Sequence, residues 1–367
     1  MALVPPHIQQ LAPYKAGKPA EELARELGLE RIVKLASNEN PMGPSKQALH
    51  AAGEALLQAH RYPDPAAYEL RTALAARFQV KLGNVITGSG SEGIMATILR
   101  TFLFEDDEMI SAANSFIGFR VLAHASGRNV HWIAMRDYHY DLEAIAAAIN
   151  DNTKIIYLAN PDNPTGTYFQ ADSFESFIKQ VPERVLVILD EAYFEYAAHL
   201  PAFPDSMRYR LDNVITLRTF SKAYGLAGLR VGYGFGHEAL IGNLLKVKLP
   251  FEPSRPAQAA ALAALEDSSY LEQVLRLNDS GMAVLLDAFG ALELAVIPSA
   301  TNFITLVLAS ADIARLLCEA MLKRGVILRH LASFGWPSLV RVTVGLPTEN
   351  EYLIEQLGGV LGEISKQ

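Results

Sequence analysis

The sequence predicts an α/β fold, with a larger domain built on a mostly parallel seven-stranded sheet and a smaller α+β domain. The first observation is that short apolar runs alternate with helical stretches from about residue 32 to residue 247. Alternation of this kind favours parallel strands with helices on both faces of the sheet. The second observation is that this alternating pattern ends at Pro250, after which an Ala-rich helix precedes mixed strands and helices.

The strands of the larger domain are expected where apolar and β-branched residues gather into short runs. They are residues 84–87, 108–111, 131–134, 154–159, 185–190, 214–218 and 231–235. The stretches between them carry helical patterns. The helices expected there include residues 93–104, 142–150 and 173–180.

The two ends of the chain are expected to form the smaller domain. After Pro250 the expected elements are a helical region over 257–286, strands at 302–308, 326–328 and 339–344, and helices at 311–323 and from 349 onward. At the other end, a Pro-containing arm precedes a helix over 20–27, which Gly28 terminates. We therefore expect an arm and helix over 1–30 that belong with the smaller domain, a larger domain over 31–247 and a smaller domain over 248–367.

The composition disfavours several classes of protein. Among 367 residues, 32 Lys and Arg stand against 40 Asp and Glu, and this net charge of −8 argues against nucleic acid or an acidic membrane surface as partner. No uncharged apolar run approaches the roughly 18 residues of a membrane span, and no signal peptide is visible. The single cysteine, Cys318, favours a reducing compartment, so a cytoplasmic location is expected. The nine histidines show no metal-ligand spacing, so no metal is expected.

The most informative stretch is Thr219-Phe220-Ser221-Lys222-Ala223-Tyr224-Gly225-Leu226-Ala227-Gly228-Leu229-Arg230, which directly follows a strand candidate. A lysine at a strand end can project into a cleft, where desolvation and cationic neighbours lower its pKa enough for imine chemistry. The hydroxyls of Thr219 and Ser221 and the guanidinium of Arg230 would suit a phosphate dianion. The alternative is a surface lysine in a glycine-rich loop.

This segment resembles the cofactor-lysine signature of fold-type I aminotransferases, which use pyridoxal phosphate (PLP), and within them the histidinol-phosphate aminotransferase branch. Four further segments resemble the same family, in the expected order. They are Leu35-Ala36-Ser37-Asn38-Glu39-Asn40-Pro41, Gly88-Ser89-Gly90-Ser91, Asn160-Pro161-Asp162-Asn163-Pro164-Thr165-Gly166 and Leu189-Asp190-Glu191-Ala192-Tyr193. The resemblance runs from residue 11 to about residue 345, and it implies a fold-type I PLP transferase.

The resemblance implies that Lys222 carries PLP as a Schiff base and that Asp190 keeps the pyridine nitrogen protonated, since the protonated ring is the better electron sink. Asp190 also ends an apolar strand, so its buried charge needs a partner. Asn163 and Tyr193 are expected to hydrogen-bond the phenolate oxygen of the cofactor. Lys222, Asp190 and Tyr193 are the expected catalytic residues.

The phosphate of the cofactor is expected at the turn before the helix that starts near Gly93, because amides at a helix N-terminus bind phosphate. By the resemblance, Ser91 and Glu92 offer main-chain N–H groups there, alongside Thr219, Ser221 and Arg230. Phe116 falls where the family places an aromatic ring on the pyridine face, with Phe119 as a nearby alternative. The resemblance also implies that Tyr62 reaches the cofactor phosphate of a neighbouring subunit, so that a homodimer shares its active sites.

The substrate end is expected in the smaller domain. Arg341 lies among β-branched residues of a strand candidate and needs an anion there. The family anchors the α-carboxylate of glutamate or the phosphate of histidinol phosphate on this arginine, and Arg329 resembles a second anion-binding arginine. The residues expected at the substrate mouth are Tyr14, Asn38, Asn40 and Asn163.

The function implied by the resemblance is transamination of L-histidinol phosphate with 2-oxoglutarate, giving imidazole-acetol phosphate and glutamate, in histidine biosynthesis. An aromatic amino-acid aminotransferase is the nearest alternative, because imidazole and phenyl rings demand similar pockets. A phosphothreonine decarboxylase-type lyase shares the lysine segment and the arginine. A PLP-binding protein without turnover is the alternative from another class.

Overall fold

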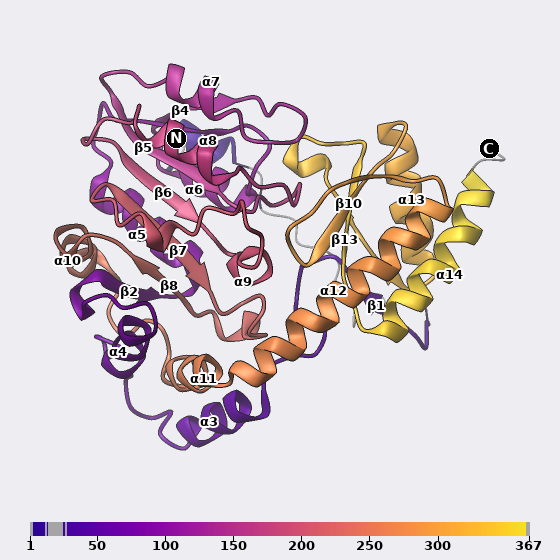
Figure 1. The fold of residues 1–367 in the computed structure, drawn as a ribbon, viewed down its shortest axis with the longest axis horizontal. Helices are drawn as coiled ribbons and strands as arrows, with labels where there is room; N and C mark the ends of the chain where they lie inside the picture. The colour runs from indigo at the N-terminus through magenta and orange to yellow at the C-terminus, as the bar shows by residue number, and fades with distance from the viewer. Residues whose placement is uncertain (1–2, 12, 14–24, 26–27, 365–367) are drawn as a thin grey trace.

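The computed structural model describes residues 3–11, 13, 25 and 28–364. Within these ranges a seven-stranded sheet dominates the larger part of the molecule (Figure 1). In spatial order its strands are β2 (Val85–Gly88), β8 (Gly232–Phe235), β7 (Val214–Thr219), β6 (Leu186–Asp190), β5 (Thr153–Ala159), β3 (Glu108–Ala112) and β4 (Asn129–Ile133). Only β8 runs antiparallel to its neighbours, so the expected mostly parallel sheet is confirmed.

Both faces of this sheet are buried, which explains why its strands read as continuous apolar runs. Alternation along β5 sends Ile155 and Tyr157 to one face and Ile156 and Leu158 to the other. The first face packs against α5 (Gly90–Phe102), α6 (Ile117–Ala125) and α10 (Glu238–Val247). The other face packs against α7 (Leu142–Ala147), α8 (Ala171–Ile178), α4 (Tyr68–Arg77) and α11 (Arg255–Glu266). The α/β layers expected from the sequence are therefore present.

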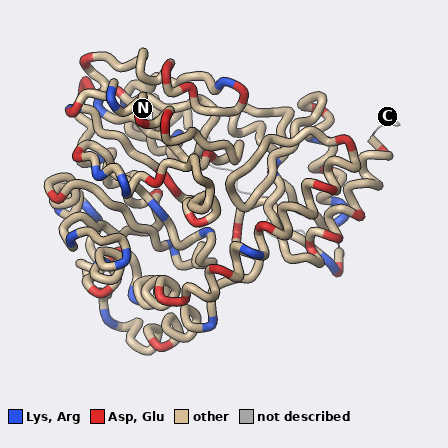
Figure 2. The backbone as a smooth tube through the Cα atoms, viewed as in Figure 1, with Lys and Arg blue, Asp and Glu red and all other residues tan. Residues whose placement is uncertain are grey.

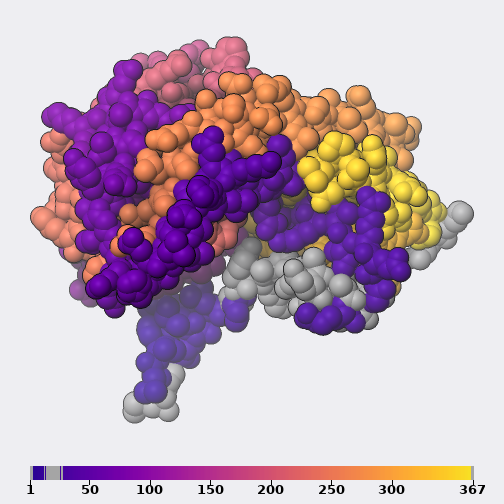
Figure 3. All heavy atoms as spheres, turned by 90° about the horizontal axis from the view of Figure 1, so that it is seen from below, coloured from indigo at the N-terminus to yellow at the C-terminus, as the bar shows by residue number. Residues whose placement is uncertain are grey.

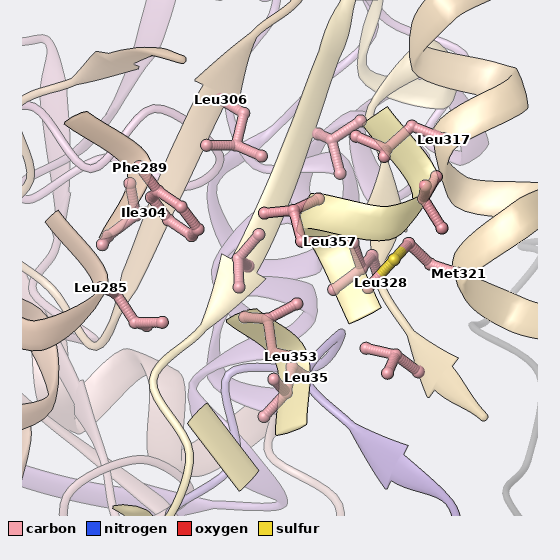
Figure 4. Close-up of a cluster of buried hydrophobic side chains, with 14 of the residues drawn as sticks. Leu35, Leu285, Phe289, Ile304, Leu306, Leu317, Met321, Leu328, Leu353 and Leu357 are labelled. Atoms are coloured by element: carbon pink, nitrogen blue, oxygen red, sulfur yellow. The ribbon is translucent and has the colours of Figure 1, made fainter. Parts of the chain in front are cut away.

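The smaller part of the molecule is built on an antiparallel sheet in the order β12 (Arg329–His330), β13 (Leu339–Thr343), β10 (Phe303–Val307) and β9 (Ala295–Ile297). A parallel pair joins β1 (Val33–Lys34) to β11 (Val326–Ile327). Helices α13 (Ala311–Lys323) and α14 (Pro347–Ile364) cover this sheet. Figure 4 shows how Ile304 and Leu306 of β10 lie in one apolar cluster with Leu353 and Leu357 of α14.

A long helix, α12 (Ser268–Ala291), joins the two parts (Figure 1). Near its start Leu271 packs against the core that contains α11, whereas Leu285 and Phe289 near its end lie in the core of the smaller part. The helical region expected over 257–286 is thus two helices, interrupted where Asp267 accepts a hydrogen bond from the Tyr270 amide at 3.1 Å and begins α12.

The division of the chain into domains stays a proposal, and the packing suggests a refinement. Val33 and Leu35 lie in the core of the smaller part, and α11 packs on the seven-stranded sheet. We therefore propose that the larger domain extends through α11 and that the smaller domain takes in residues 31–36. The helix expected over 20–27 lies mostly outside the described residues.

Helix α3 (Lys46–Leu56) lies on the surface of the larger part and packs along α11 (Figure 3). Acidic and basic residues are interspersed over both parts of the chain (Figure 2). Cys318 lies partly buried in α13 against the apolar core, where burial raises the pKa of its thiol to about 12. None of the helices in the described ranges is long and apolar enough to cross a membrane.

Candidate active site

A cavity opens at the carboxyl ends of β5, β6 and β7, whose last residues, Ala159, Asp190 and Thr219, lie on its wall. Ligand sites of open α/β sheets form at this edge, because the connections there diverge and leave a crevice. The cavity holds about 580 Å³ of space, including solvent at its mouth. Ten of the residues expected around the cofactor line it: Ser91, Glu92, Phe116, Asn163, Asp190, Tyr193, Thr219, Ser221, Lys222 and Arg230.

Lys222 is half-buried just beyond the end of β7, with its Nζ donating to the Ser37 carbonyl oxygen at 3.3 Å. Burial, together with the positive charge of Arg341, lowers the pKa of Lys222 from 10.5 to about 8. A substantial fraction of the Lys222 side chain is therefore a neutral amine near neutral pH. A neutral amine is the form that attacks a carbonyl carbon, so the lysine expected to be reactive has the environment for that chemistry.

Asp190 ends β6 and is only 4% exposed. Its Oδ2 accepts a hydrogen bond from the Tyr157 hydroxyl at 2.8 Å, while its Oδ1 is buried without a hydrogen-bond partner. Burial raises the pKa of Asp190 to about 7. An unsatisfied buried carboxylate oxygen is costly, so the geometry calls for a donor from a ligand at this position.

The opposite end of the cavity offers donors for an anion. Helix α5 begins at Gly90 without a side-chain cap from Ser89, so its first amides remain to be satisfied. Ser221 Oγ accepts from Thr219 at 3.0 Å and from Arg230 at 3.3 Å, which leaves the Ser221 proton to be donated. These groups together suit a phosphate dianion.

Two glycines allow the groups proposed to bind the phosphate to lie close together. Gly90 has φ +74°, and a Cβ on it would lie 2.7 Å from Arg230 Nη2. A Cβ on Gly232 would clash with the amide nitrogen of Ser91. Larger residues at these two positions would push Arg230 or the start of α5 away from the cavity.

Tyr193 and Asn163 both present donors to the cavity. The Tyr193 hydroxyl accepts from Asn38 Nδ2 at 2.8 Å, so its own proton is left to donate. Burial raises the pKa of Tyr193 to about 12, which keeps that proton in place. Asn163 Oδ1 accepts from Arg341 Nη1, and this leaves its Nδ2 group as a donor. A phenolate oxygen between these two side chains would be stabilised.

The two phenylalanines considered for ring stacking differ in the structure. Phe119 is fully buried and stacks on Tyr157 at 4.0 Å between ring centroids. Phe116 lies on the cavity wall, and Gly118 makes room for it, because a Cβ there would lie 2.6 Å from the Phe116 ring. Phe119 is therefore a core residue, and Phe116 is the ring available to a ligand.

The two arginines expected at the substrate end are cross-strand neighbours, since Arg329 of β12 pairs with Arg341 of β13. Arg341 is buried and donates to Asn163 Oδ1 and, at 2.7 Å, to the Ala36 carbonyl oxygen. Arg329 is more exposed and donates to Ser333 Oγ at 3.3 Å. Directly opposed residues of an antiparallel pair point to the same face, so the two side chains lie on one face of the small sheet, which favours an anion there.

Five expected residues in the described part of the chain do not line the cavity: Asn38, Asn40, Tyr62, Arg329 and Arg341. Asn40 donates to the carbonyl oxygens of Gly43 at 3.2 Å and Ala223 at 3.0 Å, so it holds the segment beside Lys222 in place. Tyr62 is 76% exposed and stacks on Phe251 at 4.3 Å. Tyr14 lies outside the described residues. The roles predicted for these residues stay predictions.

Two contacts of the site were missed by the sequence reasoning. Tyr157, which donates to Asp190, lies inside an apolar strand, and a hydroxyl two residues before the strand end was the available signal. The Ser37 carbonyl oxygen that accepts from Lys222 is a main-chain atom, so no side-chain motif marks it.

The cavity fits PLP in three respects. The Oδ1 atom of Asp190 needs a donor, and a protonated pyridine nitrogen is one. The uncapped start of α5 with Ser221 and Arg230 suits the phosphate. Lys222, with its lowered pKa, suits the aldehyde.

Comparison with known proteins agrees with this geometry. The family described as aminotransferase class I and II matches residues 30–357. The chain is 46% identical over 365 residues to histidinol-phosphate aminotransferase 2 of Pseudomonas aeruginosa, with 98% of each chain covered. It is 45% identical to histidinol-phosphate aminotransferase 1 of Thiobacillus denitrificans, covering 98% of this chain and 94% of that relative.

A solved structure of histidinol-phosphate aminotransferase from Sinorhizobium meliloti, in complex with pyridoxal-5'-phosphate, superimposes with a TM-score of 0.90 at 29% identity. The match covers 99% of both chains. The fold class expected from the sequence is thereby confirmed. Since the family match covers nearly the whole chain and the cavity lies where the family's motifs converge, this protein belongs to the class I and II aminotransferases.

Proposed function

We propose that the protein is a PLP-dependent histidinol-phosphate aminotransferase. It would convert L-histidinol phosphate and 2-oxoglutarate to imidazole-acetol phosphate and glutamate, in histidine biosynthesis. The observation that carries the proposal is the cavity in which Lys222, with its lowered pKa, lies with the unsatisfied Oδ1 of Asp190 and the uncapped start of α5. The names of the full-length relatives support the choice of substrate.

The chain's own residues would each act on a stated atom. Bound PLP supplies an aldehyde and a ring that withdraws electrons from the substrate Cα. Lys222 Nζ accepts the proton from the donor Cα and returns it during transfer of the amino group, as general base and acid. Asp190 Oδ1 holds a proton on the ring nitrogen, and Tyr193 and Asn163 donate to the ring oxygen.

Arg341 serves two substrates of different shape in turn. A guanidinium binds either a carboxylate or a phosphate through paired N–H groups, so one side chain can hold the acid group of glutamate and the phosphate of histidinol phosphate. Arg329, its cross-strand neighbour, adds positive charge on the same face of the small sheet. This pair favours a donor that carries a phosphate.

We also propose a homodimer with shared active sites. Tyr62 is exposed outside its own cavity, and other large apolar side chains on the same stretch of chain are exposed as well: Leu49, Leu56, Leu57 and Tyr68. Exposed apolar residues grouped in this way favour an interface. In such a dimer Tyr62 would reach the phosphate of the partner's cofactor. A cytoplasmic location stays a prediction.

The test is a competition between amino donors. Purified protein with PLP and 2-oxoglutarate is given L-histidinol phosphate, phenylalanine or phosphothreonine, and glutamate and carbon dioxide are measured. We expect kcat/KM for histidinol phosphate to exceed that for phenylalanine by roughly 10²-fold or more, because the phosphate adds charge-assisted hydrogen bonds. A preference for phenylalanine would identify an aromatic aminotransferase. Release of carbon dioxide would identify a lyase, and PLP binding without turnover a non-catalytic protein.

A further inference from the structure

Asp162 has no part in the function proposed so far, although it precedes Asn163 in the loop after β5. It is 0% exposed, and it accepts hydrogen bonds from Ser115 Oγ at 2.5 Å and from Thr165 Oγ1 at 2.9 Å. Burial raises the pKa of Asp162 to about 6, while the hydrogen bonds that it accepts from Ser115 and Thr165 favour its ionised form. Asp162 does not line the cavity, so it cannot contact a ligand there. A buried carboxylate held by hydrogen bonds at such a place can instead position the residues beside it.

A chain of hydroxyl groups leads from the end of β5 to this carboxylate. The Ala159 amide donates to the Tyr140 hydroxyl at 3.0 Å, and that hydroxyl lies 2.6 Å from Ser115 Oγ. Ser115 has one proton, which it donates to Asp162. The Tyr140 hydroxyl must therefore donate to Ser115, so every bond of the chain points towards the charge of Asp162.

This chain ties together three elements of the cavity wall. Ala159 is a wall residue at the end of β5, Ser115 precedes Phe116, and Asp162 precedes Asn163. The side chains of Tyr140, Ser115 and Asp162 are all buried. Because water is excluded, a broken bond in this chain would leave an unsatisfied polar group, and the three elements are held firmly.

The main chain of Asp162 also holds the loop after β5 through two backbone hydrogen bonds. The Asp162 amide donates to the Thr167 carbonyl oxygen at 2.8 Å, and the Gly166 amide donates to the Asp162 carbonyl oxygen at 2.9 Å. From the smaller part, Thr305 Oγ1 donates to the Pro164 carbonyl oxygen at 2.7 Å. The direction in which Asn163 points is thus set by bonds on both of its sides.

We propose that Asp162 is a positioning residue for the cofactor, which acts through Asn163 and, by way of Ser115, through Phe116. The inference rests on the proposed function, in which Asn163 donates to the ring oxygen and Phe116 covers the ring face. Its consequence is that the electronic state of bound PLP depends on a carboxylate that never touches it.

The test compares Asp162→Asn with wild type and with Thr153→Val, a matched control. Thr153 is equally buried at the opposite end of β5, where its Oγ1 accepts from the Asn150 amide at 2.9 Å. The first readout is the pH midpoint at which the visible absorbance of protein-bound PLP changes. A displaced Asn163 would donate less well to the ring oxygen, so we expect the midpoint to rise by roughly 0.5 to 1 unit in Asp162→Asn and to stay unchanged in Thr153→Val.

A double-mutant cycle separates positioning from a general loss of stability. Asn163→Ala should raise the same midpoint, and Asp162→Asn should raise it less in that background than in wild type, because the part of the effect that passes through Asn163 is already lost. Additive shifts, or a wild-type midpoint in Asp162→Asn, would overturn the inference. If Asp162→Asn does not fold, Ser115→Ala breaks the same chain and takes its place in the cycle.

The second readout needs no cofactor. Amide hydrogen exchange of peptides covering residues 113–117 and 160–167 should become faster in Asp162→Asn and remain at the wild-type rate in Thr153→Val. Unchanged exchange in both peptides would contradict the proposed chain of bonds. If wild-type protein, separated from unbound PLP, shows no absorbance of bound PLP, it is the proposed function that fails. The exchange experiment still decides whether Asp162 holds the loop.

Discussion

Arg341 donates through Nη1 to the side-chain oxygen of Asn163, and this bond joins the strand β13 of the small sheet to the loop after β5 of the large one. The group proposed to hold the acid end of the substrate is thereby connected to a group proposed to hold the cofactor ring. An anion bound by Arg341 would compete with Asn163 for the same guanidinium. The proposed roles of these two residues would then couple substrate binding to the hydrogen bonding of the cofactor oxygen.

Replacement of Arg341 should weaken both substrates. We expect Arg341→Lys to lower kcat/KM for histidinol phosphate and for glutamate by roughly 10²-fold, because Lys keeps the charge but loses the paired N–H groups. Arg329→Ala should cost less, since Arg329 is more exposed. Steady-state kinetics with each donor measures both effects, and Arg315→Ala on the exposed side of α13 is the control. Wild-type kinetics in Arg341→Lys would exclude it as the anchor.

Replacement of Lys222 should remove turnover. We expect Lys222→Ala to lower transamination by roughly 10³-fold or more, because no other amine in the described cavity wall can take its place. Reduction of the wild-type protein with borohydride in the presence of PLP should leave a stable adduct on Lys222, detected by peptide mass spectrometry. The exposed Lys246 of α10 provides the control variant. An adduct on another lysine would refute the assignment.

Asp190 should make the stability of the cofactor-free protein depend on pH. Its pKa is about 7 in the folded protein against 3.8 for the free side chain, so between these values the folded state binds more protons than the unfolded one. Stability should then fall as pH rises from about 4 to 7, by up to about 4 kcal/mol from this group.

Asp190→Asn tests this expectation. The variant should flatten that part of the pH profile of thermal unfolding, and PLP should remove part of the slope in wild-type protein, because it supplies a donor to Oδ1. Identical slopes in wild type and variant would show that Asp190 is not the group responsible. The variant should also retain little transaminase activity.

A shared active site predicts complementation between defective subunits. Lys222→Ala lacks the amine and Tyr62→Phe lacks the hydroxyl that would reach across, so a mixed dimer contains one site with both intact residues. Mixing the two variants should restore activity to roughly a quarter of the wild-type level under random reassortment. Mixing Lys222→Ala with itself is the control. No recovery, with exchange of subunits shown by mass spectrometry, would count against a shared site.

The sequence was most informative where chemistry coincides with the end of a strand. Asp190 and Lys222 follow apolar runs, and adjacent parallel strands bring such positions to one edge of the sheet, so their meeting could be foreseen. Local pattern could not separate Phe116 from Phe119, because the choice depends on how α6 starts relative to Tyr157 of β5.

Contacts between distant segments were also beyond reach. The pairing of β1 with β11, which carries residues 33–34 into the smaller part, joins two short strands that neither periodicity nor composition relates. The bonds from Tyr140 to Ser115 and from Ser115 to Asp162 depend likewise on tertiary packing. Hydroxyl groups in loops usually face water, so no residue pattern predicted a buried chain of hydroxyl groups.

Helix α12 packs in the cores of both parts of the molecule, so its length and register fix how the two cores are spaced along it. Its first turns are fixed in one core and its last turns in the other. One inserted residue at its middle would rotate the far half by about 100° and advance it by about 1.5 Å. If Lys222 of the larger part and Arg341 of the smaller part hold the two ends of the amino donor, as proposed, such an insertion far from any reacting atom would alter which amino donors fit.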